Sequence, residues 1–173
     1  MGAPDMKKGP NTVLMIWLLV VLGGFLWNAA LFAAPLLRHE EPFVSAFVYA
    51  AFSPVCHQLP ERSFSIHGSP LAVCGRCLGI YLGFSAGTIL YPFLRRFSRP
   101  LLPATSIFVL ASLPIGLDTA GNFLGLWASP IGLRLAAGLI WGSVLPFYLI
   151  TGLYEVRQLL GGKFRLKSPG ETK

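Results

Sequence analysis

Long apolar runs separated by short polar segments dominate this chain. Because the backbone in lipid must satisfy its own hydrogen bonds, a membrane-crossing run has to be helical. Crossing a hydrocarbon core about 30 Å thick takes roughly 20 helical residues. Four runs approach or exceed that length: Thr12–Leu37, Leu78–Leu94, Pro100–Leu117 and Leu135–Tyr154. The pattern predicts an all-α fold, an integral membrane four-helix bundle.

A fifth apolar run, Phe43–Val55, is too short for a comfortable span. Runs of about 10–14 residues more often lie at the membrane interface or enter it and return. We therefore expect an interfacial or re-entrant helix at about residues 42–55, before the second span. A helix there would bring Cys56 beside the mouth of that span.

No repeat or linker divides the chain, so residues 1–173 are predicted to form a single membrane domain. Its spans are placed at about residues 12–37, 74–94, 100–117 and 135–154, and residues 155–173 are expected to form a basic cytoplasmic tail. Lys7 and Lys8 precede the first run, but that run exceeds the 7–15 apolar residues typical of a secretory signal. We interpret it as a retained helix.

The composition excludes an ordinary soluble globule. Hydrophobic residues make up 54% of the chain and charged residues only 12%, against about 25% charged in typical soluble domains. The lipid bilayer is therefore the expected partner. The net charge of +7 is attributed to membrane topology, and nucleic acid is not expected as a partner.

The basic residues predict an orientation in the cell membrane, whether plasma or inner. With both termini in the cytoplasm, four of the 14 Lys and Arg residues face outward: Arg38, Arg62, Arg76 and Arg134. The other ten, including the cluster at residues 95–99, face inward, as the positive-inside rule requires. This multi-pass topology places the segment that begins at Cys56 on the extracytoplasmic side.

The chemistry of the chain is concentrated between Cys56 and Tyr81. This segment contains all three cysteines and two of the three histidines. In the Cys74-x-x-Cys77 pair, two sulfurs can converge on one point. That spacing suits either tetrahedral metal ligation or a redox dithiol.

A metal site is the main prediction. Cys56, His57, Cys74 and Cys77 together form a Cys₃His set whose spacing is similar to that of structural zinc sites. Adjacent residues seldom bind the same ion, so His67 or water is an alternative fourth ligand to His57. Thiolate-rich ligation suits Zn²⁺ and also iron, including an iron–sulfur cluster.

Several polar residues are expected to support this site. Gln58, Arg62 and Ser63 could donate hydrogen bonds to the sulfurs, although Ser63 could instead cap a short helical turn. Asp118 and Arg134 stand at the ends of the third and fourth spans, either as an ion pair or as a support for the site. The supporting set is Gln58, Arg62, Ser63, Arg76, Tyr81, Asp118 and Arg134.

Two other functions remain open. The first is thiol–disulfide exchange, with Cys74 and Cys77 as the redox pair and Cys56 as a third thiol. In topology and in its CxxC the chain resembles disulfide bond formation protein B and vitamin K epoxide reductase, a resemblance that implies a quinone. Those enzymes relay electrons through a second cysteine pair, where this chain has Cys56 alone. The second is a structural disulfide that staples an exposed loop.

The segment also resembles a family of small prokaryotic membrane proteins catalogued as a domain of unknown function. Its signature is similar to C-H-Q-x-P-x-R-S-F followed by V-C-x-R-C-x-G-I-Y-x-G. The matching residues are Cys56, His57, Gln58, Pro60, Arg62, Ser63, Phe64, Val73, Cys74, Arg76, Cys77, Gly79, Ile80, Tyr81 and Gly83. The resemblance implies a membrane fold and the position of the site, but no activity.

Small residues recur at a spacing of four on two of the spans. Gly79, Gly83 and Gly87 line one face of the second span, and Gly138 and Gly142 one face of the fourth. Such faces let helix backbones approach closely. The pattern favours packing within the chain, with a homodimer as the alternative.

Overall fold

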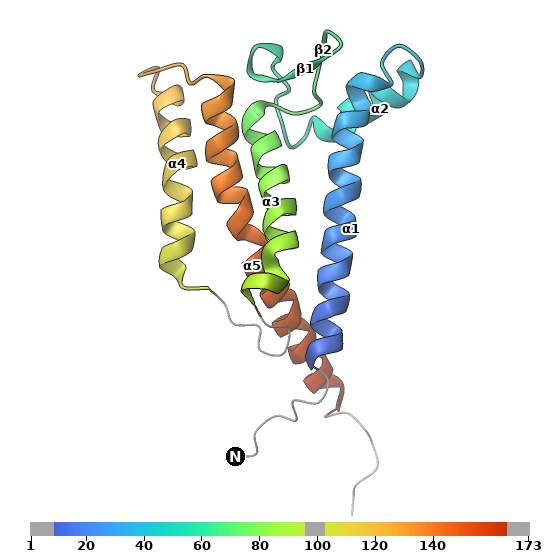
Figure 1. Cartoon of the computed structure of the whole chain (residues 1–173), viewed down its shortest axis with the longest axis vertical. Coiled ribbons are helices and arrows are strands. Elements are labelled where there is room, and N and C mark those ends of the chain that lie inside the picture. The colour runs from blue at the N-terminus through green and yellow to red at the C-terminus, as the bar shows by residue number, and fades with distance from the viewer. Residues whose placement is uncertain (1–8, 96–102, 166–173) are drawn as a thin grey trace, which may run out of the picture.

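A computed structural model of the chain describes residues 9–95 and 103–165. It contains five α-helices and one short hairpin within these ranges. The helices are α1 (Gly9–Leu36), α2 (Pro42–Phe52), α3 (Gly75–Leu94), α4 (Thr105–Phe123) and α5 (Ile131–Arg165), and the antiparallel hairpin pairs β1 (Ser65–Ile66) with β2 (Ser69–Pro70). The four long helices run side by side, with α2 and the hairpin gathered at one end (Figure 1).

Four helices are long and apolar enough to cross a membrane, which confirms the predicted fold class. The qualifying segments are Asn11–Leu36, Gly75–Leu94, Thr105–Phe123 and Ile131–Leu160. The helix before the second span is also present, as α2, and its 11 residues are too few to cross.

Helix bounds differ from the expected ones mainly in the second half of the chain. The third span is α4, which starts at Thr105 and continues past Leu117 to Phe123. The fourth span is α5, which starts at Ile131 and continues past Tyr154 to Arg165. Apolar runs mark the lipid-facing length of a helix, whereas the helix itself also includes polar residues at both ends. The expectations for residues 1–8, 96–102 and 166–173 lie outside the described residues.

The closest contact in the bundle joins α3 to α5. A Cβ atom added to buried Gly79, Gly83 or Gly87 would collide with backbone atoms of α5. In return, a Cβ on Gly138 or Gly142 would collide with the backbone of α3. Both glycine faces are therefore used within the chain, where they bring the two backbones into direct contact.

The outer helices attach to this central pair through fewer contacts. On α1, Trp17 Nε1 donates to the carbonyl oxygen of Thr88 over 2.7 Å, and Asn28 Nδ2 donates to Ser85 Oγ over 2.8 Å. On the other side, Trp141 Nε1 of α5 donates to Ser112 Oγ of α4 over 3.0 Å. Polar groups within apolar helices thus specify which faces meet.

A compact apolar cluster closes the bundle at the end that carries α2 and the hairpin, here called the cysteine end. Residues from α1, α2, the following loop and α3 meet in it. Its buried members are Leu31, Ala34, Phe52, Cys56, Leu71, Ala72, Val73 and Leu78. The loop before α3 is therefore anchored to the helices by buried side chains rather than free in solvent.

The α3–α5 contact predicts that alanine substitution at two glycines has different effects on the stability of the fold. Gly83→Ala would place a methyl group 2.5 Å from the carbonyl oxygen of Leu139 and should destabilise the fold by about 1–3 kcal/mol through overpacking. Gly152→Ala meets nothing within 4 Å and should be neutral or stabilising by up to about 1 kcal/mol. Unfolding in detergent followed by circular dichroism measures both, and equal stabilities would contradict the assigned contact.

Candidate functional site

The three cysteines converge at the cysteine end of the bundle. Their sulfur atoms all lie within 4.8 Å of one another, close enough to bind a single metal ion. Cys56 is buried, whereas Cys74 and Cys77 are half-buried, and none of the three is in a disulfide. Residues from two separate segments thus share one point in space.

Local helix geometry explains how each sulfur reaches this point. Cys74 is the N-cap of α3, with an extended backbone, and its carbonyl oxygen accepts the first helical hydrogen bond from Leu78 over 2.9 Å. Cys77 lies in the first turn of the same helix. Cys56 ends the turn after α2, where its backbone N–H donates to Phe52 O over 3.1 Å.

Hydrogen bonding favours the thiolate form of Cys74. The backbone N–H of Cys74 donates to the Cys56 sulfur over 3.1 Å. The thiols of Cys56 and Cys77 lower the pKa of Cys74 well below its usual value, and the backbone N–H groups of Arg76 and Cys77 lower it further against the effect of burial. Since the thiolate is both the metal ligand and the nucleophile, Cys74 is prepared for either chemistry.

Aromatic side chains lie beneath the cysteines on the side of α1. The Trp27 ring centroid is 4.9 Å from that of Phe52 and 5.5 Å from that of Tyr81, both in edge-to-face arrangements. Tyr81 packs against the same buried cluster as Cys56 and Cys77. The predicted supporting residue Tyr81 therefore lies next to the site, and Trp27 and Phe52 join it there.

The histidines lie apart from the sulfurs in the part of the chain that the structure describes. The metal-compatible group contains the three cysteines and no histidine. His57 is exposed although it follows Cys56 directly, and His67 is exposed in the hairpin turn with a φ of 50°. Successive residues project in different directions, which separates the His57 ring from the Cys56 sulfur.

The supporting residues of the loop bind backbone atoms. Gln58 Nε2 donates to Tyr49 O of α2 over 2.7 Å. Buried Ser63 donates through Oγ to Leu59 O over 2.8 Å, closing the short 3₁₀ turn Pro60–Arg62. The Arg62 side chain is exposed. Gln58 and Ser63 thereby shape the loop that delivers Cys56 to α3.

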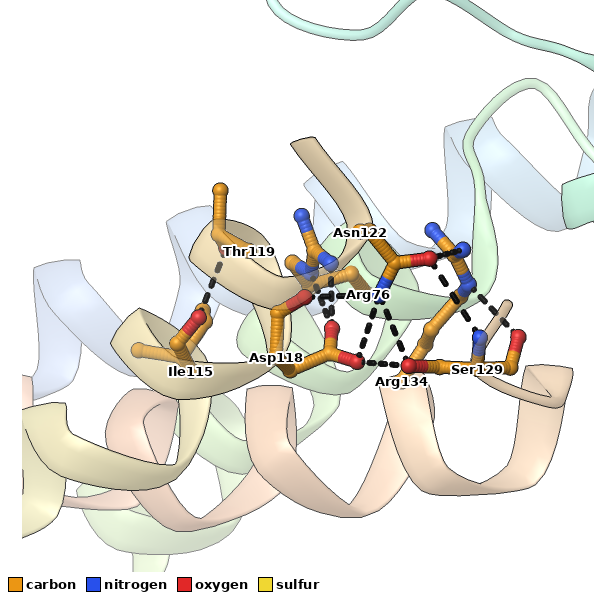
Figure 2. Close-up of polar contacts among 7 residues, drawn as sticks. All are labelled: Arg76, Ile115, Asp118, Thr119, Asn122, Ser129 and Arg134. Carbon is orange, nitrogen blue, oxygen red and sulfur yellow. Dashed lines mark hydrogen bonds and ion pairs between the residues drawn. The ribbon is translucent and has the colours of Figure 1, made fainter. Parts of the chain in front are cut away.

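Arg76 of α3 begins a polar network that extends to α4. Its guanidinium forms an ion pair with Asp118, in which Nε donates to Oδ2 over 3.0 Å (Figure 2). The other carboxylate oxygen accepts from Ser129 Oγ and, over 3.1 Å, from Asn122 Nδ2. The Asp118 charge is thus compensated by one cation and two neutral donors.

Arg134 of α5 completes the network. Its Nε donates to Ser129 O over 3.0 Å, and it also donates to Asn122 Oδ1. Arg76, Asp118 and Arg134 were expected near the site, whereas Asn122 and Ser129 were missed. Asn122 stands four residues after Asp118 on one helical face, a spacing that could have identified it; Ser129 lies in a loop and offers no such signal.

The region of the site matches a known protein family. Residues 56–148, more than half of the chain, match the family described as predicted membrane protein (DUF2085). The chain belongs to the DUF2085 family. Within that match lie the three cysteines and all five residues of the polar network, so the family region coincides with the site described here.

Two archaeal relatives support this assignment. The chain is 33% identical over 146 residues to an uncharacterized protein of Methanocaldococcus jannaschii, covering 81% of this chain and 94% of the relative. It is 37% identical over 91 residues to an uncharacterized protein of Methanothermobacter thermautotrophicus, covering 51% and 78% respectively. No solved structure matches.

The polar network predicts that Asp118 stabilises this DUF2085 fold. Asp118→Ala would leave the cation of Arg76, about a fifth exposed, without its partner, at a cost of about 3 kcal/mol in unfolding free energy. The neighbouring Thr119 is exposed, and its hydroxyl donates to Ile115 O one turn back (Figure 2). Thr119→Ala is therefore the matched control, with a change within about 0.5 kcal/mol. Denaturant unfolding that gives both variants the same stability would refute the role of the network.

Proposed function

We propose that this DUF2085 protein binds one metal-ion centre, Zn²⁺ or iron, through Cys56, Cys74 and Cys77. The observation that supports it is the approach of all three sulfur atoms to within 4.8 Å of one another. Soft thiolate ligands suit Zn²⁺ and iron, including iron–sulfur clusters. Sulfur ligands about 2.3 Å from a tetrahedral Zn²⁺ stand roughly 3.8 Å apart, so a small movement would complete the site.

Three clustered sulfurs favour a metal over a structural disulfide. A disulfide would consume two of the cysteines and leave the third half-buried or buried beside it. Three thiolates at this distance repel one another unless a cation lies between them. A divalent ion removes that repulsion and uses every sulfur in the cluster.

The fourth coordination position defines what such a site does. Structural zinc sites are closed by four protein ligands, whereas catalytic sites keep one position for water or substrate. The three cysteines supply three ligands, and His57 or His67 could supply a fourth only by moving from its exposed position. We favour an open position that holds water, with His57 as the alternative ligand.

The proposed site faces the extracytoplasmic side of the cell membrane, plasma or inner. Arg38, Arg62, Arg76 and Arg134 are the basic residues of the cysteine end. Arg95 at the end of α3 and Arg157 in the second half of α5 belong to the opposite end. The predicted topology assigns ten Lys and Arg residues to the cytoplasmic side and four to the other side, a bias that supports a cytoplasmic location of both termini.

Thiol–disulfide exchange is the second candidate, and the lowered pKa of Cys74 favours it. In that reaction, Cys74 and Cys77 lose two electrons and two protons to form a disulfide, and a membrane quinone accepts both to become a quinol. The Cys56 thiolate could then attack the disulfide, forming a new S–S bond and releasing one thiolate. The same cluster of sulfurs would serve as a redox relay instead of a ligand set.

Metal analysis of protein purified without oxygen tests the main proposal. We expect about one zinc or iron site per chain in the wild type and in His57→Ala. Cys74→Ser should lose most of the metal, because two thiolates bind far more weakly than three. Elemental analysis and a free-thiol count on the same samples measure both quantities.

The two candidate functions give different results in this experiment. Wild-type protein without metal, with two thiols missing until reductant is added, would replace the metal proposal with thiol–disulfide exchange. Metal retained in Cys74→Ser would show that it binds elsewhere. Loss of metal in His57→Ala would identify His57 as the fourth ligand. Four protein ligands close the coordination sphere and argue for a structural site.

A further inference from the structure

A groove lies between α1 and α3 directly below the cysteines. Its volume is about 470 Å³, within the 300–1,000 Å³ typical of small-molecule sites. Its walls are almost wholly apolar and come from α1, α3 and α5. The lining residues used below are Gly23, Gly24 and Trp27 of α1 with Ile80, Tyr81 and Phe84 of α3.

Two glycines on α1 create this space. A Cβ atom on Gly24 would approach Ser85 Oγ to 3.1 Å, so this glycine lets α1 pack on α3. A Cβ on Gly23 would meet nothing within 4 Å. The missing side chain at Gly23 therefore opens the groove without contributing to helix packing.

The position of the groove determines what can enter it. All its lining residues belong to membrane-spanning helices, and Leu22 and Leu26, which stand next to Gly23 and Trp27 in the sequence, are exposed on the surface of α1. That surface faces lipid. Asn28 also lines the groove, but its amide nitrogen donates to Gly24 O and Ser85 Oγ. Because the remaining wall residues are apolar or aromatic, the occupant must be an apolar chain that arrives from the bilayer.

The end of the groove that Tyr81 lines is the end nearest the cysteines. Tyr81 lines the groove and, like Cys77, packs against the buried cluster that contains Cys56. It stands four residues, about 6 Å along the helix axis, from Cys77. A chain in the groove would thus bring its polar head toward the three sulfurs from the membrane side.

We propose that the groove binds the hydrocarbon tail of a membrane-dissolved amphiphile and presents its head group to Cys56, Cys74 and Cys77. The inference rests on the proposed function, since it makes a lipid-soluble molecule the substrate or ligand of that site. Water-soluble reagents reach the sulfurs from the loop side instead. Tail length therefore controls which route a thiol reagent takes.

Two maleimides that differ only in tail length test this route. The cysteine thiolate adds across the maleimide double bond to form a C–S bond, and the ring carbon then takes a proton, so no oxidant or leaving group is needed. N-dodecylmaleimide probes the groove, and N-ethylmaleimide probes access from water. The rates are measured by mass spectrometry on full-length protein in lipid nanodiscs, and the ratio of the two rates cancels differences in thiol reactivity.

Gly23→Leu fills the groove, and Gly152→Leu is the matched control because a Cβ at Gly152 also meets nothing within 4 Å. We expect the dodecyl-to-ethyl rate ratio to fall several-fold in Gly23→Leu and to stay at the wild-type value in Gly152→Leu. An unchanged ratio in Gly23→Leu, or an equal fall in both variants, would overturn the proposal.

Metal content measured before labelling separates this inference from the proposed function. All three proteins should contain the same amount of metal, because neither glycine contacts the cysteines. A chain without metal would refute the metal site, yet the ratio would still report on the groove. A normal metal content with an unchanged ratio would refute only the groove.

Discussion

The direct backbone contact between α3 and α5 is the constraint on which the rest of the molecule depends. Gly79 and Gly83 of α3 and Gly138 of α5 remove the side chains that would hold the helices apart. In a membrane, such contact replaces the hydrophobic driving force that packs helices in water. The same contact continues to the start of α3, where Gly75 lies against Ile131. The first turn of α3, and with it Cys77, is thereby set against a rigid partner.

Polar contacts then add what glycine packing cannot supply, namely the attachment of α4. The Arg76–Asp118 ion pair joins α3 to α4, and Arg134 brings α5 into the same network. Charged groups near hydrocarbon are costly unless paired. Their mutual pairing therefore makes this arrangement of α3, α4 and α5 more stable than arrangements that leave the charges unpaired. On the opposite side, buried apolar residues hold the loop so that Cys56 meets Cys74 and Cys77.

The sequence predicts the parts of this architecture that depend on local pattern. Apolar length identified the four spans and α2, glycine periodicity indicated the α3–α5 face, and CxxC spacing indicated that Cys74 and Cys77 converge. What it could not predict depends on three-dimensional detail. His57 and Cys56 are neighbours in the chain, yet Cys56 is buried and His57 is exposed. The packing of the loop on α2 determines this difference. Ser129 joins the network from an irregular loop that carries no periodic signal.

The central claim is that three sulfur atoms from two segments of the chain bind one metal ion. X-ray absorption at the edge of the bound metal counts those ligands directly. We expect three sulfur neighbours, about 2.3 Å away for Zn²⁺, with one lighter atom completing the shell. A shell with two or fewer protein sulfurs would contradict it, because Cys56 would then lie beside the metal site without belonging to it.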